Sequence, residues 1–365
     1  MKPKLRFKEF SDEWCETTLG ETTTFKQGIQ VDVDKQFSKP FDNSVRFIRI
    51  VDYTQNTKDI RYISKPANAN YVDEHDVVLV RYGATAGFVG HGIKGVIANN
   101  MFTVTPNSNI NKDFLYTILK QDKIYNKLNS SNGSSAMPAL NFGSVSILKF
   151  SYPSIDEQNK LTNLINLLDK KIELQSKKIE DLKLFKLSKM NMIFKNANSK
   201  ITLKDICIIE KGKQVNSEFL LDTGKYYMLN GGILPSGYLD DYNTEENTIT
   251  ISEGGNSCGF VKYNKEKFWC GGHCYKILNS KINNVYLYQL LKYNENKIMD
   301  LRVGSGLPNI QKKDLENFKF EIHNDINQKK IANYLNNFDK KIDLEQSKLN
   351  ILNELKKGLM QNMFV

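Results

Sequence analysis

Apolar side chains recur with helical spacing in two long segments that follow one sequence plan. Residues 158–194 align with residues 328–364 at a constant offset of 170 and without a gap. Both segments contain Asp-Lys-Lys-Ile, at 169–172 and at 339–342. A period far above the roughly 20–50 residues of solenoid repeats indicates two copies of a domain-sized unit. At 1.5 Å per residue, each predicted helix is about 55 Å long.

Within each segment the apolar residues fall on two heptad positions, which we call the seam. The seam consists of Leu161, Ile165, Leu168, Ile172, Gln175, Ile179, Leu182, Lys186, Lys189 and Ile193, and of Ile331, Leu335, Phe338, Ile342, Glu345, Leu349, Leu352, Lys356, Leu359 and Met363. Such spacing predicts a coiled coil. Both copies break the pattern at the same steps, Gln175 with Glu345 and Lys186 with Lys356. We therefore expect the helices to face each other, or a partner, under similar constraints.

The stretch before each helix reads as strand-rich. Residues 46–52 and 76–80 have the apolar and β-branched character of strands, and residues 81–90 add a glycine-punctuated turn and strand. Residues 114–128 have helical spacing, and a polar loop covers 130–135.

The second stretch mirrors the first only loosely. Gly28 aligns with Gly212 at an offset of 184, and Gly83 aligns with Gly255 at an offset of 172. The two helices are therefore copied closely, whereas the two heads that precede them have diverged.

Start and stop signals divide the chain. Ser154 and Glu157 have the spacing of a capping box at the start of the first helix, and residues 196–199 read as a linker. The predicted fold class is α+β, with two strand-rich mixed α/β domains separated by two long helices. The predicted divisions are 1–153 for the first head, 154–197 for the first helix, 198–323 for the second head and 324–365 for the second helix.

Charge and cysteine content narrow the function classes. The net charge of +10 suggests a polyanionic partner, although a merely basic, lysine-rich protein is the alternative. The odd number of cysteines, five, favours reduced thiols, and residues 1–10 are charged and contain no apolar core. No long apolar run is present either, so we expect a cytoplasmic protein without a membrane segment.

Four motifs accompany the order head, helix, head, helix: they are Leu5-Arg6-Phe7, Phe47-Ile48-Arg49-Ile50, Gly304 to Ile310, and Gln328-Lys329-Lys330-Ile331 leading into Asp339-Lys340-Lys341-Ile342. With these motifs and this order, the chain resembles the specificity subunit of type I restriction–modification systems. The resemblance covers nearly the whole chain.

The resemblance implies a non-catalytic subunit with internal pseudo-two-fold symmetry. Each head would read one half of a bipartite, asymmetric sequence in double-stranded DNA. The helices would pair antiparallel, set the spacer between half-sites, and dock two methyltransferase subunits and, through these, nuclease/translocase subunits. The chain itself would bind no cofactor. S-adenosylmethionine would belong to the methyltransferase subunit, and ATP and Mg²⁺ to the nuclease/translocase subunit.

Basic, amide and hydroxyl side chains near the turns are the DNA-binding candidates, since Arg bonds guanine bidentately and Asn or Gln bonds adenine. In the first head they are Lys26, Gln27, Arg49, Arg81, Tyr82, Thr85, Ser130, Asn132 and Ser134. In the second head they are Lys211, Lys213, Gln214, Asn230, Asn256, His273, Arg302 and Ser305. The alternatives remain open: Arg81 as a surface charge, Arg49 as a structural ion-pair partner, and His273 as an ordinary surface histidine.

The helices supply the spacer and partner-docking candidates. They are Leu161, Leu168, Lys170, Lys171, Ile172, Ile179, Leu182, Ile331, Phe338, Lys340, Lys341, Ile342, Leu349 and Leu352. Ordinary solvated helix charge is the alternative for the four lysines. A coiled-coil adaptor without DNA specificity is the alternative function for the chain as a whole.

Catalytic and metal motifs are weak. Residues 88–92 match the F-x-G-x-G pattern of methyltransferases, but the chain has no adjacent prolines, so a stand-alone DNA methyltransferase is disfavoured. Cys258, Cys270, His273 and Cys274 have no standard zinc spacing, and the aligned part of the first head lacks such ligands. The sequence therefore predicts no catalytic residue and no metal site.

Overall fold

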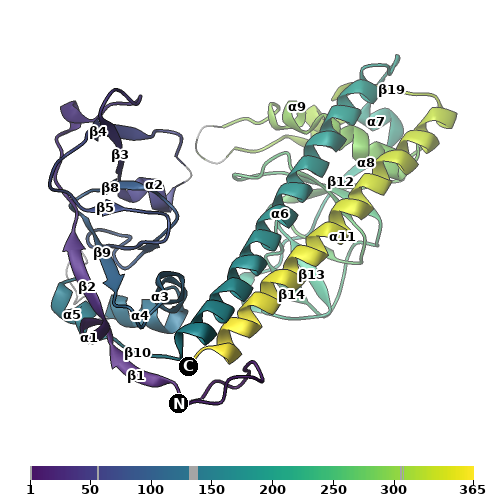
Figure 1. Ribbon diagram of the computed structural model, residues 1–365. Helices are drawn as coiled ribbons and strands as arrows, with labels where there is room; N and C mark the ends of the chain where they lie inside the picture. Colours follow the sequence, from purple (N-terminus) through teal and green to yellow (C-terminus); the bar gives the residue numbers. More distant parts are fainter. Residues whose placement is uncertain (1, 56, 131–138, 305, 307) are drawn as a thin grey trace. The chain divides into compact units, whose positions relative to one another are not determined.

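The computed structural model describes residues 2–55, 57–130, 139–304, 306 and 308–365 (Figure 1). The chain forms two compact units. The first consists of residues 1–174 with 349–365, and the second of residues 175–348. Each unit therefore contains one head and a part of both long helices. The four-part division predicted from the sequence follows different lines and stays a prediction.

The first head contains two four-stranded sheets and a two-stranded ribbon. One sheet has the order β2 (Thr23–Gln27), β9 (Met101–Pro106), β6 (Val77–Val80), β7 (Val89–Gly90). The other has the order β4 (Arg61–Ser64), β3 (Ser44–Ile48), β8 (Gly95–Ile97), β5 (Tyr71–Val72), and β1 (Cys15–Thr18) pairs with β10 (Lys149–Tyr152). The helices are α1 (Leu19–Thr22), η1 (Val33–Lys35), α2 (Ile50–Thr54), α3 (Lys112–Leu119), α4 (Asp122–Ser130) and α5 (Phe142–Ser146).

The second head repeats this plan with fewer residues. One sheet has the order β12 (Ile208–Lys211), β18 (Cys274–Leu278), β15 (Thr248–Ser252), β16 (Val261–Asn264). The other has the order β14 (Gly237–Leu239), β13 (Tyr226–Leu229), β17 (Trp269–Cys270), and β11 (Ser199–Thr202) pairs with β19 (Lys319–Ile322). The helices are α7 (Leu203–Ile206), η2 (Ser217–Phe219), α8 (Asn284–Tyr293), α9 (Glu295–Met299) and α10 (Lys312–Glu316).

Two sequence-based assignments in the first head are wrong in detail. The strand predicted for 46–52 ends at Ile48, and α2 begins at Ile50 because the Asp52 carboxylate accepts a hydrogen bond from the Arg49 backbone N–H at 2.8 Å and starts a helical turn. The helix predicted for 114–128 is two helices, α3 and α4. Leu119 and Ile124 are five residues apart, so the apolar rhythm of one helix is interrupted between them.

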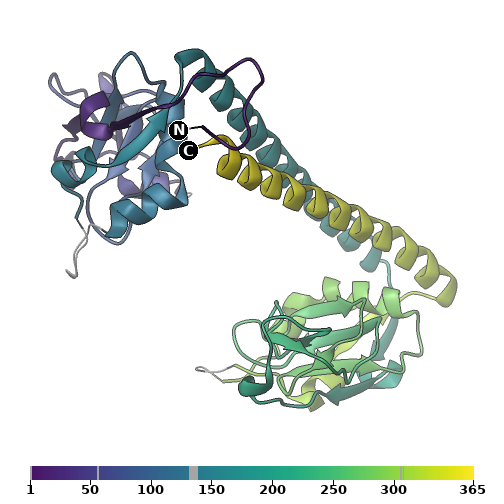
Figure 2. The same cartoon turned by 90° about the horizontal axis from the view of Figure 1, so that it is seen from below.

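The two long helices, α6 (Ile155–Phe194) and α11 (Asp325–Met363), pack along the predicted seam. Every seam position is buried or half-buried. In the second unit, Lys186 Nζ lies 2.6 Å from Asp339 Oδ1; in the first unit, Lys356 bonds Asp169. Within the second unit, Gln175 contacts Glu345 and Lys186 contacts Asp339. The residue number of the partner on α11 therefore falls as that on α6 rises, so the two helices run antiparallel (Figure 2). The offset of 170 exchanges these two ion pairs, which is the pairing pattern of an internal two-fold repeat.

The other predicted break pairs with its own repeat. Gln175 Nε2 donates to Glu345 Oε2 at 2.7 Å and to the Glu345 carbonyl at 2.9 Å. Lys178 and Lys348 lie 3.0 and 3.2 Å from the other carboxylate oxygen. Hydrogen bonds from Gln175 and Lys178, with Lys348, lower the pKa of the Glu345 carboxyl to about 2. Both polar breaks therefore serve the pairing of α6 with α11 within the chain.

We expect Glu345→Gln to flatten the acid side of the stability profile. The folded-state pKa lies below the ordinary value of 4.5. The stabilisation is therefore fully present above about pH 4.5 and is lost as the pH falls towards about 2. Urea unfolding between pH 2 and 6 should show a weaker pH dependence for E345Q than for the native chain. Glu354→Gln, at an exposed position of α11, is the matched control and should keep the native slope.

Each long helix ends inside a hydrophobic core, through Phe194 at the end of α6 and Phe364 just after α11. In the first unit, Phe364 stacks on Phe114 with ring centroids 5.9 Å apart. In the second unit, Phe194 packs on Tyr286 at 5.8 Å. The helix ends are thus part of the head cores, which ties each head to the helix pair. The predicted α+β class with paired long helices is confirmed. Among the described residues, no helix combines the length and apolarity that crossing a bilayer requires.

Candidate nucleic-acid interfaces

In each head, a polar cluster lies at the end of an inner strand of the four-stranded sheet, β6 in the first head and β15 in the second. In the first head, Arg81 follows β6, and its backbone bonds Asn100 on one side and Leu140 on the other, at 2.8 and 2.9 Å. In the second head, Glu253 follows β15, and its backbone bonds His273 and Ile310, both at 2.9 Å. The same backbone frame therefore presents a cation in one head and an anion in the other.

Arg81 is held in a defined position. Its guanidinium lies 4.9 Å from the ring centre of Tyr82 and 5.1 Å from that of Phe142. Nη1 donates to Gln27 Oε1 at 2.8 Å and Nε donates to the Leu140 carbonyl at 3.2 Å. These contacts already fix the Arg81 side chain. Its remaining N–H donors can therefore bind a ligand with little further loss of side-chain entropy. Gln27, Arg81 and Tyr82, all predicted from the sequence, therefore form one cluster.

The equivalent cluster in the second head has a different chemistry. Lys211 corresponds to Gln27, and its Nζ lies 2.5 Å from Glu253 Oε1. His273 Nδ1 lies 3.7 Å from the other carboxylate oxygen of Glu253. The His273 backbone N–H donates to Asn230 Oδ1 at 3.1 Å, so Asn230 joins the same cluster.

A glycine beside each cluster has no room for a side chain. A Cβ at Gly28 would lie 2.2 Å from the Ala98 carbonyl oxygen, and a Cβ at Gly212 would lie 2.3 Å from the Gly271 oxygen. This close approach fixes the course of the chain that carries Gln27 in one head and Lys211 in the other. The two heads therefore keep the same backbone course at this position, because neither glycine has room for a side chain. The side chains beside it differ between the heads.

The remaining candidates surround these clusters or lie apart from them. Lys26 is exposed on β2 and bonds the Ala69 carbonyl at 3.0 Å. Lys213 and Gln214 are exposed just after β12, and Thr85 and Asn256 lie in the equivalent glycine turns. The side chain of Ser130, together with Asn132, Ser134 and Ser305, lies outside the described residues.

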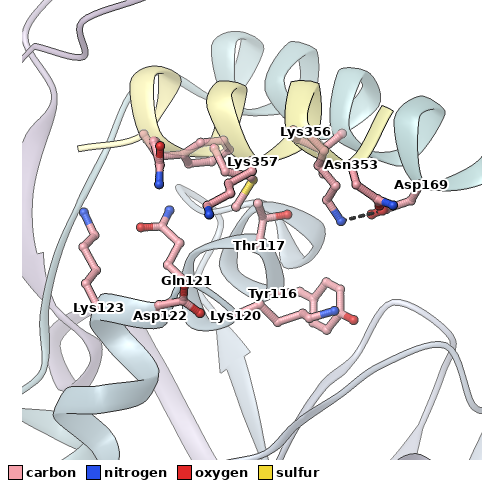
Figure 3. A pocket seen from close by; sticks show the side chains of 14 residues that line it. Tyr116, Thr117, Lys120, Gln121, Asp122, Lys123, Asp169, Asn353, Lys356 and Lys357 are labelled. Atoms are coloured by element: carbon pink, nitrogen blue, oxygen red, sulfur yellow. Dashed lines mark hydrogen bonds and ion pairs between the residues drawn. The ribbon is translucent and has the colours of Figure 1, made fainter. Parts of the chain in front are cut away.

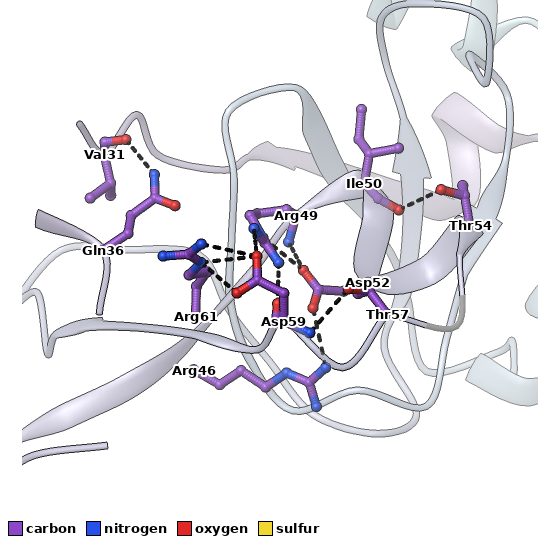
Figure 4. Close-up of polar contacts among 10 residues, drawn as sticks. All are labelled: Val31, Gln36, Arg46, Arg49, Ile50, Asp52, Thr54, Thr57, Asp59 and Arg61. Carbon is purple, nitrogen blue, oxygen red and sulfur yellow. Dashed lines mark hydrogen bonds and ion pairs between the residues drawn. The ribbon is translucent and has the colours of Figure 1, made fainter. Parts of the chain in front are cut away.

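Arg49 and Arg302 have intramolecular partners. Arg49 lies 3.2 Å from Asp52 and 3.1 Å from Asp59, and Arg46 and Arg61 bond the same two carboxylates (Figure 4). The Arg302 Nε donates to the Met299 carbonyl at 2.6 Å. For Arg49, this network favours the structural ion-pair interpretation that the sequence left open.

Sequence reasoning missed Glu253 and Phe142. No acidic residue is among the sequence-predicted candidates, although the offset of 172 aligns Glu253 with Arg81. Phe142 lies 61 residues after Arg81 in the sequence, and no local pattern links the two.

The cysteines of the second head are buried, and the glycine motif of the first head lies at a strand. Cys258 packs in the main core of the second head, whereas Cys270 and Cys274 pack in a separate small cluster. The Cys258 thiol donates to the Glu253 carbonyl at 2.9 Å. Within residues 88–92, Val89 and Gly90 form β7, which pairs antiparallel with β6, and the Tyr53 ring covers Gly90.

The helices offer further surfaces. The seam residues pack between α6 and α11, whereas Lys170, Lys171, Lys340 and Lys341 are exposed. Apolar side chains also lie outside the seam, with exposed fractions between 48% and 68%: they are Leu167, Leu174, Ile351 and Leu355 in the first unit and Leu184, Leu187, Met192 and Leu344 in the second. We call these the outer helix residues; they were not predicted.

One cavity of about 520 Å³ lies in the first unit between α3, α4 and the long helices (Figure 3). Lys120, Lys123, Lys356 and Lys357 line it together with Asp122 and Asp169. Its apolar lining includes Met360 and Phe364. With four lysines against two carboxylates and an apolar part, this lining suits a protein segment that carries both acidic and apolar side chains.

Comparison with known proteins identifies similar sequences. A family model described as the type I restriction modification DNA specificity domain matches residues 11–184 and 197–356. A Mycoplasma pneumoniae protein named as a type I specificity subunit is 36% identical over 155 residues, which are 40% of this chain and 41% of the relative. One from Mycoplasma genitalium is 31% identical over 170 residues, 46% of this chain and 44% of the relative. The chain thus matches less than half the length of these curated relatives.

Two solved structures share the fold over the whole chain. The S subunit of a type I restriction–modification system from M. genitalium matches with a TM-score of 0.73 and 19% identity, covering 100% of this chain and 99% of that one. A chain from a structure on the complex assembly of a type I system matches with a TM-score of 0.55 and 15% identity, covering 96% and 97%. Since the family model spans both heads and most of both helices, the chain belongs to the type I restriction modification DNA specificity domain family.

Proposed function

We propose that this chain is the non-catalytic DNA-recognition subunit of a type I restriction–modification complex. The observation that carries the proposal is the shared frame at Arg81 and Glu253, where equivalent backbone positions present different side chains. Two diverged reading surfaces on one scaffold suit a DNA site with two different halves. The first head reads one half, and the second head reads the other.

The chemistry of each cluster suits base edges in the major groove. Arg81 can donate to the O6 and N7 of guanine, and Gln27 beside it can bond adenine. Glu253 can accept from the N4 amino group of cytosine, and Lys211 beside it can contact a base or a phosphate. Lysine supplies most of the net charge of +10, so the surrounding positive charge positions the DNA through phosphates.

The paired helices set the distance between the half-sites and dock two methyltransferase subunits. The outer helix residues and the lysine-rimmed cavity are the surfaces that support docking. S-adenosylmethionine acts in the methyltransferase subunit, and ATP and Mg²⁺ act in the nuclease/translocase subunit, which joins through the complex. The complex acts on double-stranded DNA in the cytoplasm.

Methylation by reconstituted complexes tests this function. The chain alone should methylate no DNA, and the chain with its methyltransferase subunit should modify one asymmetric bipartite motif in a sequenced methylome. Arg81→Gln should relax discrimination in one half only, by about 1–3 kcal/mol for the base it contacts. Glu253→Gln should act on the other half only.

Arg49→Gln is the control for these variants, because Arg49 is engaged by Asp52 and Asp59. It should lower the unfolding midpoint and leave the motif unchanged. Methylation by the chain alone would point to a stand-alone methyltransferase. A complex whose DNA binding shows no bipartite preference would point to a protein adaptor.

A further inference from the structure

Two histidines and one aspartate meet in the first head. None of them is among the residues that contact Arg81. His75 lies in the turn between β5 and β6, His91 follows β7, and Asp113 lies in the first turn of α3. His75 Nδ1 is 3.0 Å from Asp113 Oδ1, and His91 Nε2 is 3.2 Å from the same oxygen. The chain has four histidines, so half of them meet at one carboxylate oxygen.

The His91 ring offers one nitrogen to the cluster. Among the described residues, its Nε2 is buried without a hydrogen-bond partner, although Asp113 Oδ1 is close. The ring stacks on Tyr116, with centroids 4.3 Å apart. Stacking fixes the ring plane and keeps Nε2 beside the Asp113 carboxylate, so this nitrogen is available as a metal ligand.

The spacing of the three ligand atoms suits a small divalent ion. All three lie within 4.8 Å of one another. Zinc bonds of about 2.0–2.1 Å in a tetrahedral arrangement place neighbouring ligand atoms about 3.3–3.5 Å apart. Small side-chain adjustments reach this geometry from separations of 3.0 and 3.2 Å.

The carboxylate is positioned from two sides. The Asn111 side chain accepts from the backbone N–H of Asp113 at 2.8 Å and caps α3. Asn166 Nδ2 donates to Asp113 Oδ2 at 3.5 Å, which leaves Oδ1 facing the histidines. The side chain of His75 is 68% exposed, so an ion can enter from solvent and keep a water as its fourth ligand.

The second head provides an internal comparison. The offset of 172 aligns His75 with Asn247, His91 with Tyr263 and Asp113 with Val285. The Tyr263 hydroxyl lies 3.4 Å from Asn247 Oδ1, and Tyr263 packs on Tyr288 as His91 packs on Tyr116. The second head thus joins the same elements with a neutral hydrogen bond. The second head therefore folds without these three side chains, so the fold itself does not require two histidines and an aspartate here.

We propose that His75, His91 and Asp113 bind one divalent first-row transition-metal ion of the Zn²⁺ class. Two imidazoles and one carboxylate suit zinc and its neighbours rather than Mg²⁺ or Ca²⁺, which take oxygen ligands. The ion joins the β5–β6 turn and the end of β7 to the start of α3. This site goes beyond the DNA-reading function and differs from the absence of metal predicted from the sequence.

Zinc titration of the full-length chain tests the site. Isothermal calorimetry and competition with a chromogenic chelator should give one Zn²⁺ per chain. His75→Gln and Asp113→Asn should each weaken Zn²⁺ binding by at least about tenfold, a loss that altered metal environments commonly produce. Zn²⁺ should raise the melting temperature of the native chain by mass action, and it should do so far less in either variant.

His273→Gln is the matched control, because it removes a histidine of the second head that lies beside Glu253. It should bind Zn²⁺ as the native chain does. Co²⁺ substitution should give ligand-field absorption without thiolate charge transfer. The proposal fails if the native chain binds no Zn²⁺, if H75Q and D113N bind it with native affinity, or if Co²⁺ shows thiolate ligation by Cys258, Cys270 or Cys274. Because His75 is mostly exposed, H75Q keeps the test valid if D113N does not fold.

Discussion

Replacing Lys186 by methionine should destabilise the second unit by about 2–3 kcal/mol, because it leaves a partly buried carboxylate without its cation. The Lys186 side chain is 9% exposed and that of Asp339 is 23% exposed. Burial lowers the pKa of the Lys186 ammonium, while Asp339 opposes that shift. The pair therefore gains little over an apolar contact, but each member depends strongly on the other.

The repeat offers a matched control for this variant. Lys356 and Asp169 form the exchanged ion pair in the first unit, with side chains 28% and 49% exposed. Lys356→Met should cost less than about 1 kcal/mol, as exposed pairs do. Urea unfolding at pH 7 compares K186M with K356M.

A double variant separates the lost pair from lost packing. Lys186→Met with Asp339→Asn should recover most of the stability, because the amide can still accept the hydrogen bond that Gln289 donates at 2.6 Å. Equal effects of K186M and K356M, or no recovery in the double variant, would contradict a buried charge pair in the seam.

The helices were predictable because their information is local and repeated. A seam of regular spacing needs only the α-helical period, and the matched breaks at Gln175 with Glu345 indicated that the helices face each other or a partner. Even so, the sequence did not identify Asp339 as the partner of Lys186. This contact depends on the register of the antiparallel helix pair, that is, on which turns of α6 and α11 lie side by side. A single heptad pattern permits several registers.

The sites were harder to predict because sheet pairing brings distant residues together. Gln27 and Arg81 are adjacent through β2, β9 and β6, and that order is not encoded in either residue's neighbourhood. The same holds for His75, His91 and Asp113, which stand on three elements with no motif spacing. Likewise, the sequence alone does not reveal that Asp52 and Asp59 both lie beside Arg49. Composition identifies chemistry, whereas topology decides which groups meet.

Replacing the second head by a copy of the first should abolish recognition of the second half-site and duplicate the first. The junctions are chosen at equivalent strands: residues 15–153 replace residues 199–323. Thr18 pairs with Lys149 in the first head, and Thr202 pairs with Lys319 in the second, so both grafted ends keep a native register. Phe194 would meet Phe114 in place of Tyr286, as Phe364 already does in the first unit.

Methylome sequencing of the grafted chain with its methyltransferase subunit measures the result. Because α6 and α11 run antiparallel and exchange equivalent contacts, we expect the new motif to be an inverted repeat of the first half-site. Each mismatched base pair costs about 1–3 kcal/mol, so methylation of the original asymmetric site should fall by at least about tenfold. The reciprocal graft should duplicate the other half. The contrary result is that the second half-site is still recognised after the second head is replaced, or after Glu253 is lost. Either outcome would show that recognition is not divided head by head. The chemical difference between the Arg81 and Glu253 clusters would then have another function.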